Sequence, residues 1–137
     1  MLNISEAVSL ALHTMVILAN NTDKKLTTKE IASEIGGSEA HLSKVLQRLT
    51  KQGLVKSERG PKGGFALGKP DEDIPLLEVY EAIEGPIQPM CCLLNRDECI
   101  GSKCILGGLI QDVDRQVRGY LGVTRLSEFP SKKRRRK

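Results

Sequence analysis

The sequence predicts a mainly α-helical protein with one small β-hairpin. Three observations carry this prediction. Several segments have apolar residues every three to four positions, two short segments rich in strand-forming residues flank a glycine-rich turn, and glycines follow the helical segments. The 137 residues are about one domain's worth of chain. We therefore expect one compact body with an appendage rather than two independent cores.

The first 53 residues predict three helices. Residues 4–19 have the apolar spacing of a first helix, and residues 27–35 predict a short second helix that two glycines end. Ser38 is a suitable N-cap for a third helix that runs to about residue 52. One face of this third helix is apolar and its other faces are basic. The second and third helices therefore match a helix-turn-helix, whose second helix can lie in a DNA major groove.

Residues 54–59 and 64–67 predict a β-hairpin directly after these helices. Arg59 and Lys62 lie at its turn, where glycines let the backbone approach a phosphate surface and an arginine can enter a minor groove. A solvated surface turn is the alternative, but the preceding helix-turn-helix favours a DNA-contacting wing. The sequence thus predicts a winged helix-turn-helix DNA-binding domain over residues 1–86.

The C-terminal part predicts a different kind of element. A small helix over residues 75–84 is expected to pack the wing onto the body. A long apolar stripe follows from residue 104 to residue 121, too extensive for one small domain to cover. We interpret residues 105–125 as a dimerisation helix, with a purely intramolecular helix as the alternative. Residues 126–137 are expected to form a C-terminal segment with a disordered basic tail.

Charge and hydropathy bound the partners and the compartment. The formal charge is +4, but the last six residues are all basic, and without them acidic residues outnumber basic ones. Net charge therefore does not argue for nucleic acid, and the motif must carry that prediction. No apolar run approaches the roughly 18 residues of a membrane span, and no signal peptide precedes the first helix. We expect a cytoplasmic protein without a membrane partner.

The four cysteines, Cys91, Cys92, Cys99 and Cys104, all lie within fourteen residues. In a reducing cytoplasm such a cluster argues against structural disulfides and favours a metal or redox role. We therefore expect residues 87–104 to form a cysteine-rich sensor loop.

Three motifs resemble one known family. They are the run Leu-Ser-Lys-Val-Leu-Gln-Arg-Leu at residues 42–49, the run Arg-Gly-Pro-Lys-Gly-Gly-Phe-Ala-Leu at residues 59–67, and Ala-Ile-Glu-Gly-Pro at residues 82–86. Over nearly the whole chain the sequence resembles the IscR/NsrR family of bacterial regulators. These are winged-helix dimers, several of which sense iron, redox state or nitric oxide through an iron–sulfur cluster.

The resemblance implies two sets of DNA contacts. In the third helix, the residues expected to face base edges and phosphates are Ser38, His41, Ser43 and Lys44. In the wing, the residues expected to enter a groove are Arg59, Gly60, Pro61 and Lys62. Side-chain chemistry adds Arg48, because Lys44 and Arg48 are long donors suited to guanine edges or phosphates. The alternative for Arg48 is that it only solvates the helix.

The resemblance also implies a cluster held by Cys92, Cys99 and Cys104, of either the 2Fe-2S or the 4Fe-4S type. Their spacing departs slightly from the family pattern, and the usual fourth-ligand positions correspond to Gly107 and Ser9, which supply no ligand. His13 is the leading candidate for the fourth ligand, because it matches a first-helix position that ligates across the dimer interface in one branch of the family.

The ligand set and the metal both have alternatives. Cys91, Asp97 or a small thiol can replace His13, whose structural alternative is a hydrogen-bonded helix histidine. Zinc, a thiol switch or inert thiols are alternatives to the iron–sulfur cluster.

These features together predict a transcriptional regulator rather than an enzyme. We expect a homodimer that binds a double-stranded operator, acts as a repressor, and senses redox state, iron or nitric oxide through the cluster. The alternative is a cluster-free winged-helix regulator controlled by a protein partner or by thiol oxidation. The sequence has no phosphate-binding glycine loop or nucleophile elbow, which argues against catalysis.

Overall fold

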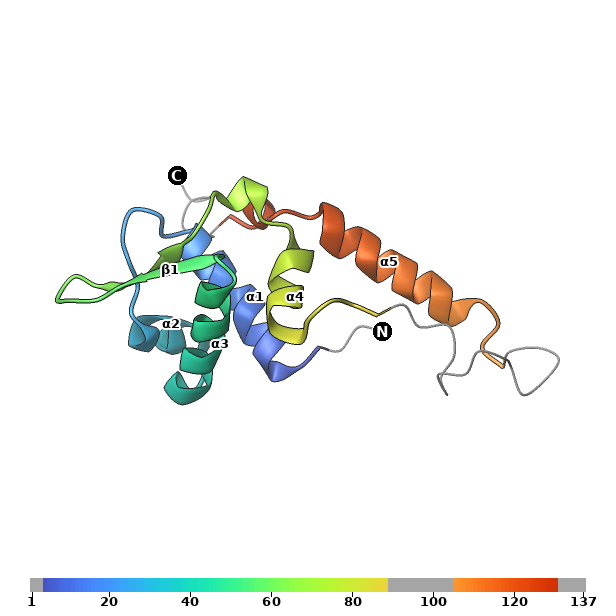
Figure 1. Cartoon of the computed structure of the whole chain (residues 1–137), viewed down its shortest axis with the longest axis horizontal. Helices are drawn as coiled ribbons and strands as arrows, with labels where there is room; N and C mark the ends of the chain where they lie inside the picture. Colours follow the sequence, from blue (N-terminus) through green and yellow to red (C-terminus); the bar gives the residue numbers. More distant parts are fainter. Residues whose placement is uncertain (1–3, 89–104, 131–137) are drawn as a thin grey trace.

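The structure is a computed structural model, and it describes residues 4–88 and 105–130 (Figure 1). This part of the chain contains five α-helices, a two-stranded antiparallel sheet and two short 3-10 turns. In chain order the elements are α1 (Glu6–Ala19), α2 (Thr28–Ile35), α3 (Glu39–Lys51), β1 (Val55–Glu58), β2 (Gly64–Leu67), a 3-10 turn (Asp71–Asp73), α4 (Leu76–Glu84), α5 (Leu109–Val123) and a second 3-10 turn (Leu126–Glu128). The predicted fold class, a winged helix-turn-helix followed by a long C-terminal helix, is confirmed.

Local sequence signals position the helix-turn-helix. Thr27 caps α2 through a capping box with Glu30, and Gly36 ends the helix in the left-handed conformation at φ 80°. Ser38 then caps α3, as predicted. These caps and the glycine specify where α2 ends and α3 begins, and the two helices also pack against each other and against α1.

The core lies between α1, α3 and α4, which pack against one another. Its fully buried side chains include Val8, Met15, Ile31, Leu46 and Leu49. The expectation that α4 joins the wing to the body is wrong, because α4 packs mainly on α1, α3 and α5. The wing is instead attached through β2, which packs on α1 and forms a β-bridge from Phe65 to Leu26.

The C-terminal helix is shorter than predicted. α5 begins at Leu109 and ends at Val123, whereas the apolar pattern predicted a helix over residues 105–125. Gly107 adopts φ 60°, a left-handed conformation that interrupts a helix, and no side chain caps the N-terminus of α5. In Figure 1 the N-terminal half of α5 extends away from the other helices.

The chain after α5 returns to the body. The amide of Leu76 donates to the Thr124 carbonyl at 3.0 Å, and the amide of Leu126 donates to the Ile74 carbonyl at 2.9 Å. Leu126 is 1% exposed, and Asn20 Nδ2 donates to the carbonyl of Phe129. The C-terminal end of α5 is thus held to the body, while the predicted disordered tail, residues 131–137, lies outside the described residues.

Candidate nucleic-acid interface

The outer face of α3 is polar and exposed. Burying Leu42, Leu46 and Leu49 turns the opposite side of the helix outward, and that side carries Ala40, Lys44, Gln47 and Lys51 at helical spacing. Of these, only Lys44 was among the predicted DNA contacts. Gln47 lies between Lys44 and Lys51 and has the amide chemistry that recognises adenine edges. The sequence already offered a signal for Gln47 as a candidate contact, because its position on α3 is opposite the apolar leucines.

Ser38 and His41 have structural partners at the start of α3. The Ser38 hydroxyl accepts the amide of His41 at 3.4 Å, which caps the helix. The His41 ring nitrogen Nδ1 lies 3.4 Å from Glu6 Oε1, which connects α3 to the first turn of α1. Both residues therefore orient the N-terminus of α3, the part of a recognition helix that approaches bases. Ser43 is half-buried on the same helix.

Arg48 makes a contact that the sequence did not indicate. Its Nη1 donates to the carbonyl of Ile83, at the C-terminal end of α4, over 3.0 Å. A helix C-terminus has unpaired carbonyls and partial negative charge, so a guanidinium is a favourable partner. The alternative interpretation, that Arg48 only solvates α3, is wrong, and its DNA contact stays a prediction.

The wing turn is a tight β-turn over residues 60–63. Gly63 donates its amide to the Gly60 carbonyl at 2.9 Å, and Pro61 occupies the second position of the turn, where its fixed φ is favoured. A Cβ on Gly63 would lie 2.3 Å from the Glu58 carbonyl oxygen, so glycine is required there. Arg59, Pro61 and Lys62 are exposed around this turn. The end of the wing is therefore narrow and basic, as groove contact requires.

Two carboxylates near the wing are held ionised by their neighbours. Hydrogen bonding and charge from Lys25 lower the pKa of Glu58. The backbone and hydroxyl of Thr27 lower the pKa of Glu30 by hydrogen bonding in the capping box. Both carboxylates therefore carry a negative charge: that of Glu58 is paired with Lys25, and that of Glu30 interacts with the charge of Lys24.

The predicted cluster ligands lie mostly outside the described residues. Cys91, Cys92, Cys99 and Cys104 all fall in residues 89–104, as does Asp97. Within residues 4–88 and 105–130, no group of three or more histidine, cysteine or acidic side chains has the arrangement of a metal site. Of the ligand candidates, only His13 is described.

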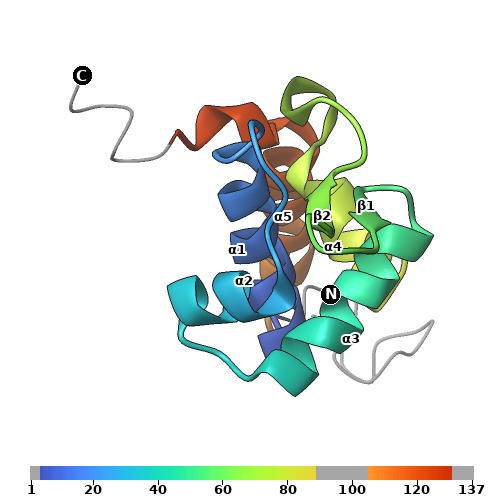
Figure 2. The same ribbon diagram turned by 90° about the vertical axis from the view of Figure 1, so that its left-hand side faces the viewer.

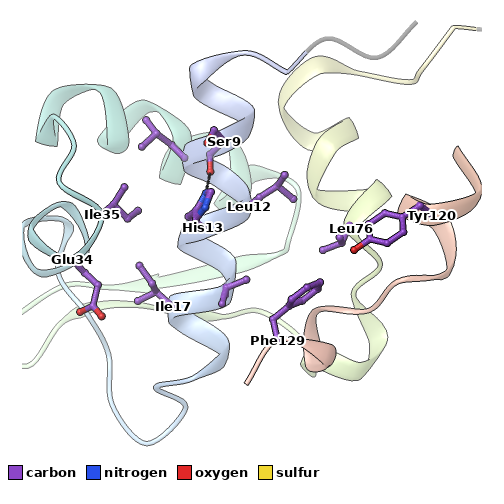
Figure 3. Close-up of a pocket in the computed structure, with 11 residues that line it drawn as sticks. Ser9, Leu12, His13, Ile17, Glu34, Ile35, Leu76, Tyr120 and Phe129 are labelled. Atoms are coloured by element: carbon purple, nitrogen blue, oxygen red, sulfur yellow. Dashed lines mark hydrogen bonds between the residues drawn. The ribbon is translucent and has the colours of Figure 1, made fainter. Parts of the chain in front are cut away.

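His13 has one ring nitrogen engaged and lines an apolar pocket (Figure 3). Its Nδ1 lies 2.7 Å from the Ser9 carbonyl oxygen. A carbonyl only accepts hydrogen bonds, so Nδ1 carries the proton and a neutral ring leaves its lone pair on Nε2. Metal-binding histidines are commonly oriented by such a backbone hydrogen bond. The side chain thus has the chemistry of a ligand.

The pocket beside His13 has a volume of about 780 Å³. Its walls come from α1, α2, the start of α4, the C-terminal half of α5 and the segment after it. It is lined by Ser9, Leu10, Leu12, His13, Val16, Ile17, Glu34, Ile35, Leu76, Tyr120 and Phe129. Apolar side chains dominate this lining, so the pocket favours another apolar surface over a charged ligand.

Figure 2 shows the side of the molecule on which α2, α3 and the wing are displayed together. An exposed basic helix beside a basic hairpin defines the winged helix-turn-helix class of DNA-binding proteins. The family model of Rrf2, described as iron-dependent transcriptional regulator, matches residues 4–131. The chain belongs to the Rrf2 family, and it is therefore a transcriptional regulator rather than an enzyme.

Two similar proteins agree with this assignment, and a third shares the fold. The HTH-type transcriptional regulator IscR of Photorhabdus laumondii is 34% identical over 101 residues, which cover 73% of this chain and 61% of that protein. The structure of CymR, the global cysteine regulator of B. subtilis, superposes with a TM-score of 0.79 at 31% identity and covers 93% of this chain and 95% of that one. IscR of T. potens shares the fold, with a TM-score of 0.72 at 24% identity, covering 92% and 84% of the two chains.

The match to IscR of P. laumondii thus spans less than two thirds of that relative. No helix among the described residues is long and apolar enough to cross a membrane.

Proposed function

We propose that this regulator is a cytoplasmic homodimer that represses transcription by binding double-stranded operator DNA. Its recognition helix α3 and its wing contact the DNA through Ser38, His41, Ser43, Lys44, Arg48 and Arg59 to Lys62, to which the burial pattern adds Gln47. An iron–sulfur cluster in the loop of residues 87–104 controls that binding. The observation that carries the proposal is the apolar stripe of α5, which this chain alone leaves exposed.

The stripe supports self-pairing through its spacing. Leu109, Val113, Gln116, Tyr120 and Val123 are exposed and follow one another at alternating intervals of four and three residues. That alternation is the pattern of helices that pack against each other in pairs. Leu109 and Tyr120 are each more than half exposed, at 55% and 56%. A second copy of α5 would cover them. In this proposed interface between two α5 helices, called the seam, Gln116 would be the one polar residue of the stripe.

The cluster would be held by Cys92, Cys99 and Cys104, with His13 or Cys91 as the fourth ligand. Thiolates are the usual ligands of iron–sulfur clusters, and an imidazole is a documented replacement. When bound, the cluster supplies a group that responds to oxygen, nitric oxide or iron supply. The fixed Nδ1 proton of His13 leaves its Nε2 suited to ligation.

If His13 is the fourth ligand, it acts from the partner subunit. His13 shares its pocket with Tyr120, whereas Cys104 precedes the opposite end of α5. Leu109 and Tyr120 are eleven residues apart on one helix, which corresponds to about 16 Å. When two subunits pair along α5, the first helix of one subunit can lie near the N-terminal end of α5 of the other, where the cysteines precede the helix.

Two arginines link the sensor region to the recognition helix. Arg48 of α3 donates to the carbonyl of Ile83, and Arg118 of α5 donates to the carbonyl of Ile87 while pairing with Asp114. Three residues separate the segment between Ile83 and Ile87 from Cys91 in the sequence. Movement of the cysteine loop would therefore act on α3 and α5 together. A coupling of about 1 to 3 kcal/mol would change operator affinity from several-fold to about a hundredfold.

The proposal is tested by anaerobic reconstitution of the full chain. Visible absorption with iron and sulfide analysis should report a cluster in the wild type and none in Cys92→Ala. Binding to a duplex selected from a random DNA pool should change after exposure to nitric oxide or oxygen. A cluster-loaded protein whose affinity stays the same after exposure would contradict the sensing role.

A second candidate is a cluster-free regulator that responds to thiol oxidation or to a protein partner. The similarity to the cysteine regulator CymR, over 93% of this chain, favours it. In that case Cys92→Ala would leave the metal content unchanged at zero. The response to a thiol oxidant, or to the partner, would then carry regulation.

A further inference from the structure

A basic cleft lies between the connection from α1 to α2 and the wing. Its volume is about 560 Å³. Four lysines line it, namely Lys24 and Lys25 from the connection, Lys56 from β1 and Lys62 from the wing turn. Neither Lys24 nor Lys56 was among the DNA contacts predicted from the sequence.

The acids near the cleft offset part of this positive charge, because Glu30 interacts with the charge of Lys24 and Glu58 with the charges of Lys25 and Lys56. Lys25 is paired with Glu58, and Glu30 accepts hydrogen bonds from Thr27 in the capping box. Asp23 also lines the cleft. Among the residues that the structure describes, Lys24, Lys56 and Lys62 form no ion pair within 4 Å, and all three are exposed. The cleft therefore presents a net positive surface to an incoming anion.

The two walls of the cleft are joined rigidly. Leu26 and Phe65 exchange two backbone hydrogen bonds, at 3.0 and 2.7 Å. Gly64, at φ 149°, passes so close that a Cβ would lie 2.8 Å from the Leu26 carbonyl oxygen. Together with the Lys25 to Glu58 ion pair, these contacts hold the connection against the hairpin. The cleft is thus formed before any ligand binds, which lowers the entropy cost of binding.

The cleft lies on the opposite edge of the hairpin from α3. β2 stands between β1 and the Leu26 bridge, while α3 packs against β1. Figure 1 shows the same order, with α2 and α3 below the wing and the first part of the α1 to α2 connection above it. A minor groove is only about 6 Å wide and has a phosphate backbone on each side. When the wing lies in that groove, one DNA phosphate backbone is on the side of α3 and the other is on the side of the cleft.

We propose that the cleft binds a phosphodiester of the DNA strand beyond the wing, through Lys24 and Lys56, with Lys62 at its rim. This inference rests on the proposed DNA-binding mode. The contact reads no base, since it meets only the backbone, and it fixes how deeply the wing enters the groove. A free phosphate or nucleotide has the same chemistry, so the test must distinguish the two sources.

The test measures how operator binding depends on salt. The double variant Lys24→Gln/Lys56→Gln should lower the slope of log affinity against log salt concentration by about 1.8, because a dimer has two such clefts and each phosphate contact contributes about 0.9. Between 50 and 200 mM salt, the variant should therefore lose about tenfold less affinity than the wild type. The slope should fall equally on a selected duplex and on a random one. Lys69→Gln/Arg125→Gln removes two positive charges outside the cleft and should leave the slope unchanged.

Three results would overturn the proposal. If the wild type binds DNA and the double variant keeps its slope, the cleft does not contact the backbone. If the slope is kept while inorganic phosphate raises the melting temperature of the wild type but not of the variant, the cleft is a site for a free anion. If the wild type binds no duplex in any metal state, the proposed function itself fails, which is a separate outcome.

Discussion

The proposed recognition helix α3 and the C-terminal helix α5 are both amphipathic and similar in length, but their apolar faces are not covered to the same extent. Leu42, Leu46 and Leu49 of α3 are at most 1% exposed, because α1 and α4 cover them. On α5 only Ile110 is buried, while Val113 and Tyr120 are exposed. The proposed recognition helix α3 is thus stabilised within one chain, whereas the exposed apolar residues of α5 fit the proposed pairing with a second copy.

The largest effect is expected in the core beneath α3. Leu46→Ala should lower the free energy of unfolding by about 3 kcal/mol, because it leaves a cavity under a fully buried side chain. Urea unfolding measures this best in a Val113→Asp background, which weakens the proposed dimer, at a protein concentration where that variant is monomeric. The background variant is compared with the same variant carrying Leu46→Ala. Tyr120→Ala in that background is the control and should cost far less. If Leu46→Ala and Tyr120→Ala lower the free energy of unfolding equally, α3 and α5 do not differ in how their apolar faces are covered.

Val113→Asp itself should act on assembly. A carboxylate placed in each half of the proposed seam loses its hydration, so the dimer dissociation constant should rise about thirtyfold, or about 2 kcal/mol. Sedimentation or light scattering reports the change in mass, and circular dichroism should report an intact fold. Arg115→Ala lies on α5 outside the stripe and should leave the dimer unchanged. A wild type that is monomeric at every concentration would refute self-pairing.

Arg48→Ala should have a moderate effect on stability. It removes the hydrogen bond to the Ile83 carbonyl, which is worth about 1 kcal/mol. Lys51→Ala removes a neighbouring exposed charge without that contact and serves as the control. If Arg48 only binds DNA, the two variants will unfold at the same urea concentration and differ only in affinity.

The smallest effect concerns pH at the wing. The folded state lowers the pKa of Glu58 below its ordinary value of 4.5, so its pairing stabilises the protein above that value. The contribution is lost as pH falls through the folded pKa. The Glu58→Gln variant should therefore lose slightly less stability than the wild type as the pH falls below 4.5. Because the ion pair is exposed, added salt should reduce this difference between the two proteins. Parallel melting curves of the two proteins between pH 3 and 7 test this.

The parts that local chemistry determines were predictable from the sequence. The capping residues Thr27 and Ser38 and the glycine after α2 specify the helix-turn-helix within a few residues of chain. The hairpin followed from strand-forming residues around a glycine-rich turn. On α5 the apolar spacing indicated Leu109, Val113 and Tyr120, but it did not show that Ile110 is buried. Gly107 shows the limit of this approach, because an apolar pattern does not reveal that the backbone turns left-handed there.

Contacts between distant residues were not predictable. Arg48 and Ile83 are separated by 35 positions, and Lys24 meets the wing only because Leu26 pairs with Phe65. Periodicity along one helix carries no information about which carbonyl or which loop lies opposite. The return of Leu126 to the body was missed for the same reason, since it depends on backbone pairing with Ile74.

The anchoring of α5 at one end has a mechanical consequence. Thr124 and Leu126 fix its C-terminus to the body by backbone hydrogen bonds, while its fifteen residues extend for about 22 Å toward the cysteine loop. The helix is therefore a lever with its pivot near Gly122. A tilt of about 10° at that pivot would carry the far end through about 4 Å. In the proposed dimer, a rearrangement of a few ångströms among the thiols would thus correspond to a modest rotation of each subunit relative to the other.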